Sequence, residues 1–167
     1  AVALGARLLK DITLAAHGRR RIAFAKASTR RYYTLFQRFG GLYGAVNAAT
    51  MTLVAGDRAG GRALAAAALH IPPPPGLKGE AAYYETASRA EAKFLVGDLD
   101  AARETMTRAL TLAPQAFAAH ASTLRQLEML CRETGADPAW LSTFRPPACA
   151  HFTGHILDAT RQGALSG

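Results

Sequence analysis

The chain has 167 residues and a formal net charge of +8, with half of its residues hydrophobic and 19% charged. This balance excludes wholesale disorder and supplies enough apolar side chains for one packed domain. Arg and Lys interrupt the apolar stretches, so none reaches the roughly 20 consecutive apolar residues of a membrane span, and we expect no membrane partner.

Cysteine usage and the start of the chain bear on location. Only Cys131 and Cys149 are present, which is too few for a disulfide scaffold and is typical of a reducing compartment. The first residues, AVALGARLLKD, lack an initiator Met and carry Asp11 where a signal peptide would have small residues. We therefore expect a cytoplasmic protein, of which this chain is a piece.

The excess positive charge lies in the first quarter of the chain. Residues 1–40 hold nine basic residues and one acidic residue, whereas residues 41–167 hold eleven of each. This quarter predicts two helices, 2–16 and 19–39, separated at Gly18. On a helical wheel the second helix has an aromatic and aliphatic arc, with only Arg21 intruding on it. The opposite arc, called here the basic strip, consists of Arg19, Arg20, Lys26, Arg30, Arg31 and Arg38.

Two interpretations of the basic strip remain open. A charged outer face is usual for a packed amphipathic helix, and the strip is then only solvated. Alternatively it docks an acidic protein, phosphate or nucleic acid. The sequence has no zinc-finger or RNP pattern, and no aromatic residue shares the exposed arc, so specific nucleic-acid recognition is disfavoured.

An internal repeat occupies the middle of the chain. The segment LVAGDRAGGRALAAAALHIPP (53–73) aligns without gaps with FLVGDLDAARETMTRALTLAP (94–114), at an offset of 41 positions. In each unit a Gly suited to a left-handed C-cap is followed by an Asp suited to cap the next helix, and proline ends that helix. The pattern predicts helices over 43–55, 58–70, 80–96 and 99–112.

These residues resemble the tetratricopeptide repeat, which has about 34 residues. The extra seven residues fall at GLKGEAA (76–82), while Arg89 and the absence of Trp from the first helices depart from the family pattern. The first unit, 42–75, matches through Ala49, Gly56, Asp57, Gly61, Ala68 and Pro73, and the second, 83–116, through Ala90, Gly97, Asp98, Ala102, Ala109 and Pro114.

A narrower resemblance covers residues 4–145. The segments GGLYGAVNAATMTLVAGD (40–57), ASRAEAKFLVGDLDAA (87–102) and STLRQLEML (122–130) look like the TRAF-binding region of mitogen-activated protein kinase kinase kinases and its bacterial relatives. The resemblance implies an all-α, tetratricopeptide-like solenoid of about seven or eight helices, including 115–134 and 137–143, in a domain over 1–145. It also implies a regulatory scaffold within a larger signalling protein, without catalysis of its own.

The inner helices of such a solenoid present polar residues to a peptide in the concave groove. We expect six groove residues on the first helices of the two units, namely Tyr43, Asn47, Thr50, Glu85, Arg89 and Lys93. For Asn47 an equally good interpretation is that its amide only ties neighbouring helices together by hydrogen bonds.

Two short segments raise other possibilities. The run Pro72–Pro75 could be a polyproline II ligand, but it also stands where a repeat must end and a loop begin. Cys149, His151 and His155 could be metal ligands, but no further ligand follows at a recognised spacing. We expect 146–167 to be a linker, extended in conformation, and the start of a following domain, similar to the first strand of Rossmann-like domains.

The sequence contains no nucleophile elbow, phosphate-binding loop or paired-carboxylate motif. We therefore expect no enzyme and no cofactor. The predicted function is a noncatalytic module that binds a protein or peptide, or couples neighbouring domains, in a cytoplasmic signalling protein. The alternative is a helical module that binds nucleic acid or phosphate through the basic strip.

Overall fold

The computed structural model describes residues 2–145, and this part of the chain is all-helical, as predicted. The expected linker and following domain at 146–167, with the metal candidates Cys149, His151 and His155, lie outside the described residues. The elements are α1 (Val2–Ala15), α2 (Gly18–Phe39), α3 (Leu42–Val54), α4 (Arg58–Leu69), α5 (Gly79–Val96), α6 (Leu99–Leu112), α7 (Phe117–Thr134) and the 3-10 helix η1 (Pro138–Phe144). Every predicted helix is present, with boundaries shifted by at most two residues.

The two Gly-Asp turns of the repeat have the same conformation. Gly56 and Gly97 adopt left-handed φ values of 95° and 92°, which favour glycine. The Asp57 carboxylate then accepts a hydrogen bond from the Gly60 amide at 2.8 Å, and the Asp98 carboxylate accepts one from Ala101 at 3.1 Å. Each Asp thus satisfies an amide at the start of the next helix, as the sequence predicted.

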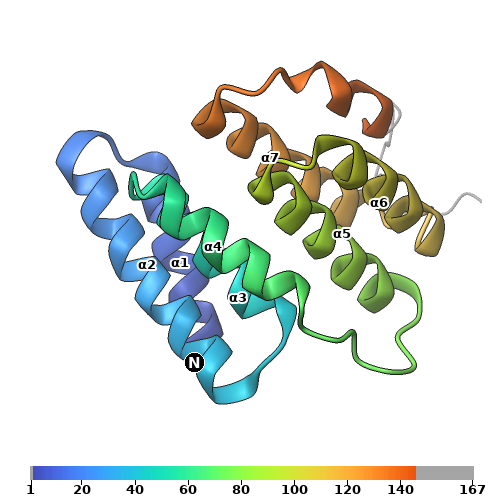
Figure 1. The fold of residues 1–167 in the computed structure, drawn as a ribbon, viewed down its shortest axis with the longest axis horizontal. Coiled ribbons are helices and arrows are strands. Elements are labelled where there is room, and N and C mark those ends of the chain that lie inside the picture. The colour runs from blue at the N-terminus through green and yellow to red at the C-terminus, as the bar shows by residue number, and fades with distance from the viewer. Residues whose placement is uncertain (1, 146–167) are drawn as a thin grey trace, which may run out of the picture.

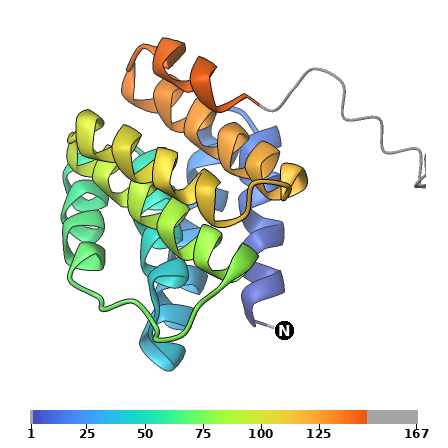
Figure 2. The ribbon, with the colours of Figure 1, turned by 90° about the vertical axis from the view of Figure 1, so that its right-hand side faces the viewer.

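Helices that follow one another in the chain pack together: α1 with α2, α2 with α3, α3 with α4, α4 with α5, and α5 with α6 (Figure 1). Contacts also skip along the chain, because α3 packs against α5, and α7 against both α3 and α5. Figure 2 shows α7 lying across the upper end of the other helices. The odd-numbered helices therefore meet one another, although the chain separates each of them from the next by a whole helix.

Small side chains allow this close approach. Ala48, Ala49, Ala90, Ala102 and Ala109 are completely buried at helix contacts. Larger side chains fill the remaining space, with Tyr32, Met51, Tyr83, Met106 and Leu130 among those that are almost completely buried. At the C-terminal end η1 adds Trp140, whose ring stacks on Phe94 with centroids 5.9 Å apart. The core is therefore continuous from α1 to η1.

Gly61 gives the sharpest test of this packing. A Cβ atom on Gly61 would stand 3.0 Å from the Ala49 carbonyl oxygen and 3.1 Å from the Leu53 amide nitrogen, both backbone atoms. We predict that Gly61→Leu lowers the free energy of unfolding by about 1–3 kcal/mol, the usual cost of overpacking. Ala63→Leu, on the exposed face of the same helix, is the matched control. Urea unfolding followed by circular dichroism measures the effect. Equal midpoint urea concentrations for the two variants would contradict the close packing at Gly61.

Candidate functional site

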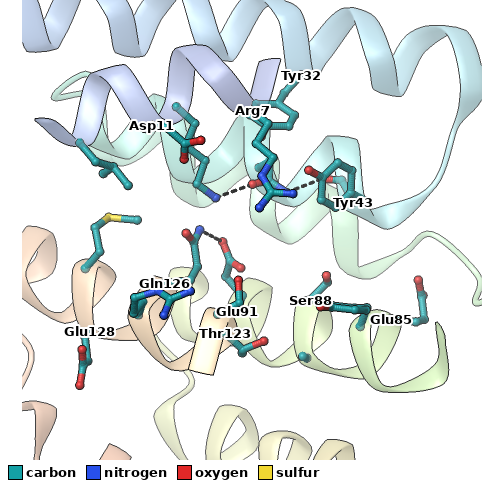
Figure 3. A pocket seen from close by; sticks show the side chains of 18 of the residues that line it. Arg7, Asp11, Tyr32, Tyr43, Glu85, Ser88, Glu91, Thr123, Gln126 and Glu128 are labelled. Atoms are coloured by element: carbon teal, nitrogen blue, oxygen red, sulfur yellow. Dashed lines mark hydrogen bonds between the residues drawn. The ribbon is translucent and has the colours of Figure 1, made fainter. Parts of the chain in front are cut away.

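The described part of the chain contains a groove of about 1140 Å³. Its walls and floor come from α1, α3, α5 and α7, with Arg21 and Tyr32 from α2 and the loop residues Pro74 and Leu77. No residue of α4 or α6 lines it. Figure 3 shows that the lining side chains of α1 and α3 face those of α5 and α7 across the groove. Segments far apart in the sequence thus form one surface.

Three of the six predicted groove residues line this concavity: Tyr43 and Asn47 on α3, and Glu85 on α5. Tyr43 is half exposed, whereas Asn47 is largely buried at the groove floor. Thr50 is completely buried and lies beneath the surface. Both helices that the repeat pattern indicated, α3 and α5, contribute to the groove, but the pattern did not determine how deeply each side chain lies.

Arg89 and Lys93, which were expected in the groove, do not line this concavity. The Arg89 guanidinium donates to the Ile71 carbonyl oxygen at 2.7 Å and to the Glu85 carboxylate at 2.8 Å, so it holds the end of the proline loop. The Lys93 ammonium donates to the Thr105 hydroxyl at 2.8 Å and links α5 to α6. Residues 81, 84, 85, 87, 88 and 91 form the groove face of α5. Positions 89 and 93 are rotated away from that face by the helical period.

A set of polar side chains, called here the polar ladder, crosses the groove floor. Its members are Lys10 on α1, Asn47 and Thr50 on α3, Glu91 on α5 and Gln126 on α7. The Lys10 ammonium donates to the Asn47 side-chain oxygen at 2.7 Å. The Glu91 carboxylate accepts from both the Thr50 hydroxyl and the Gln126 amide. Figure 3 shows the Glu91–Gln126 bond in the middle of the groove.

The Asn47 side chain is hydrogen-bonded within the chain through both its nitrogen and its oxygen. Its nitrogen donates to the Tyr43 carbonyl oxygen at 2.9 Å while its oxygen accepts from Lys10. Asn47 therefore ties α3 to α1, which is the second interpretation of this residue. Lys10, Glu91 and Gln126 escaped the sequence analysis. The repeat offset could have identified Glu91, because Glu91 is the counterpart of Thr50 and the two side chains are hydrogen-bonded.

Charge at the ladder is partly balanced. Burial lowers the pKa of Lys10, while the nearby carboxylates of Glu91 and Asp11 act in the opposite direction. The Arg7 guanidinium lowers the pKa of Lys10 further. Figure 3 shows Arg7 extending from α1 into the same groove. The charged form of Lys10 is thus less favoured in the folded chain than in water.

The groove lining includes an ion pair between helices that are distant in the sequence. Both terminal nitrogens of the Arg21 guanidinium, Nη1 and Nη2, donate to the Glu133 carboxylate of α7. Arg58 adds a hydrogen bond to the Glu133 carbonyl oxygen at 2.8 Å. Arg21 is the basic residue that fell on the apolar arc of its helix, and this pairing explains its position.

The basic strip lies on the exposed arc of α2, as predicted. The expectation that no aromatic residue shares this arc is wrong, because Tyr33 is 41% exposed and follows Lys26 and Arg30 at helical spacing. Arg19, Arg20, Lys26, Arg30, Arg31 and Arg38 are all exposed. Within residues 2–145, none of the six forms an ion pair with a carboxylate. Both interpretations of the strip require this exposure, so the placement alone does not choose between them.

Other chemical possibilities find little support in the described residues. That part of the chain contains no group of three or more His, Cys, Asp or Glu residues positioned to hold a metal ion. None of its helices combines the length and apolar character needed to cross a membrane. His120 is buried, and its ring is hydrogen-bonded to the Ala113 carbonyl oxygen at 2.9 Å. His120 is therefore engaged in packing.

Comparison with known proteins adds no relative. The chain matches no family model, no curated protein and no solved structure. The chemistry of the groove is therefore interpreted from its own residues.

The pKa of Lys10 makes a testable prediction. Because folding lowers this pKa below 10.5, the unfolded state binds more protons between the two pKa values, and stability gains from Lys10 as pH rises through that window. We predict that the unfolding free energy of the wild type increases relative to Lys10→Met as pH approaches about 10.5. Urea unfolding of both proteins across this range measures the difference. A difference independent of pH would contradict the burial of a charged Lys10.

Proposed function

We propose that this chain is a noncatalytic protein-interaction module whose groove binds an extended segment of a partner or of a neighbouring domain. The groove carries the proposal, because one concavity of about 1140 Å³ is lined mainly by α1, α3, α5 and α7. A concave surface built from successive helices is well suited to hold an extended chain.

The internal repeat supports a tetratricopeptide-like arrangement. The two Gly-Asp turns share one geometry, and the first helix of each unit, α3 and α5, contributes to the groove, whereas the second helices, α4 and α6, do not. In our proposal the helix pairs stack as in tetratricopeptide repeats and in the TRAF-binding region that the sequence resembles. The module then serves as a regulatory scaffold in a cytoplasmic signalling protein.

The polar groups of the groove floor favour binding over catalysis. Lys10 is hydrogen-bonded to Asn47, and Glu91 to both Thr50 and Gln126. A catalytic nucleophile or base must be able to reach a substrate atom. In this arrangement the hydrogen bonds of these groups hold the helices together. The more exposed residues above them then contact the ligand.

A random peptide display library tests the groove directly. We predict that peptides selected on the wild-type protein bind at least tenfold more weakly to Ser122→Trp, because Ser122 is exposed and lines the groove, and an indole there would fill it. The matched control is Ala66→Trp, an exposed position on α4 outside the groove. Fluorescence anisotropy measures both affinities. Selected peptides that bind Ser122→Trp as well as wild type would contradict the proposal.

Polyanion binding through the basic strip is a second candidate function, because none of its six exposed cations is paired with a carboxylate within residues 2–145. We predict that affinity for duplex DNA falls steeply with salt concentration, because phosphate binding releases counterions. Arg19→Glu with Arg30→Glu abolishes this binding. Arg103→Glu with Arg108→Glu, two exposed residues of α6 outside the strip, makes the same change in net charge and retains most of it. Binding that is insensitive to salt, or equally lost in both variants, would rule out the strip as a specific site.

A further inference from the structure

Two tyrosines line the groove at equivalent positions of the internal repeat. Tyr43 on α3 and Tyr84 on α5 are separated by 41 positions, the repeat offset. Their exposed fractions are nearly the same, 49% and 46%. Large exposed aromatic side chains are costly to leave in water and are enriched among the residues that dominate binding energy. The repeat thus presents one tyrosine from each unit to the groove.

Each exposed tyrosine is supported from behind by a buried tyrosine. The ring of Tyr43 meets Tyr32 edge to face, with centroids 5.9 Å apart and planes at 74°. The ring of Tyr84 meets Tyr83 in the same way, at 5.4 Å and 72°. Tyr32 and Tyr83 are almost completely buried. The support restricts the motion of the outer rings, so a ligand would lose little entropy by ordering them.

The spacing of the two helices determines what can span both rings. Helices α3 and α5 are in contact, and the axes of packed helices are about 8–10 Å apart. A polyproline II chain rises about 3.1 Å per residue and presents the same side every three residues, or about 9 Å. Side chains three positions apart in a polyproline II chain are therefore separated by about the same distance as the axes of α3 and α5.

We propose that the groove binds an extended, polyproline II-like segment that carries apolar side chains, proline or aliphatic, at positions i and i+3. One of these side chains packs on Tyr43 and the other on Tyr84. Aromatic rings form the platforms on which such segments dock, because the segment is already ordered before it binds. Pro74 and Leu77, which are also three positions apart, add apolar surface to the groove. This inference rests on the proposed peptide-binding function and specifies its ligand.

The test uses the whole chain and dodecapeptides from the random display library. We expect the selected sequences to share proline or aliphatic residues three positions apart, and a synthetic peptide with this pair to bind. Tyr43→Ala and Tyr84→Ala should each weaken its binding about tenfold or more, the effect expected for a hot-spot residue. Tyr43→Phe and Tyr84→Phe, which keep the ring, should retain most of the affinity.

Tyr33→Ala is the matched control, because Tyr33 is 41% exposed on α2 and does not line the groove. It should bind like the wild type, and circular dichroism should show that all variants remain helical. A peptide whose apolar pair is moved to positions i and i+1 should bind the wild-type protein as weakly as the original peptide binds the alanine variants. Binding that Ser122→Trp abolishes but the tyrosine variants leave intact would overturn this inference and preserve the proposed function. Failure to select any groove-dependent peptide would overturn both.

Discussion

The shape of the groove depends on the Glu91 carboxylate, which joins helices that the chain itself does not connect directly. Glu91 accepts hydrogen bonds from Thr50 on α3 and Gln126 on α7 and lies near the Lys10 ammonium of α1. A buried carboxylate without such partners would carry a large desolvation penalty. The folded state therefore favours the arrangement in which α1, α3, α5 and α7 converge on this residue. The groove is the space left above that convergence.

Small residues and capped turns make the convergence possible. Alanines and Gly61 let helix axes approach closely enough for short polar side chains to meet, while Asp57 and Asp98 set where each second helix starts. The two repeat units consequently place equivalent residues at equivalent depths. Tyr43 and Tyr84 lie at the groove surface, whereas Thr50 and Glu91 meet at its floor. One local pattern, used twice, thus gives the groove both its supporting network and its exposed aromatic rings.

The sequence predicted what depends on local chemistry. Helix boundaries followed from Gly, Asp and Pro, the exposure of the basic strip followed from the helical period, and the repeat placed Tyr43, Asn47 and Glu85 at the groove. The polar ladder was missed because its bonds join residues 35 to 41 positions apart. Arg89 and Lys93 were misplaced because polarity alone does not tell which face of α5 meets the groove and which meets α6 or the proline loop.

Amide hydrogen exchange measured on Glu91→Leu is the most direct test of the claim that this carboxylate holds the groove walls together. The account predicts faster exchange in α1 and α7 as well as in α5, because losing Glu91 frees Thr50 and Gln126 and leaves Lys10 without its nearest counter-charge. Thr105→Val, which removes the bond between Lys93 and α6, should leave α1 and α7 unchanged. Faster exchange confined to α5 in the Glu91→Leu protein would contradict the account.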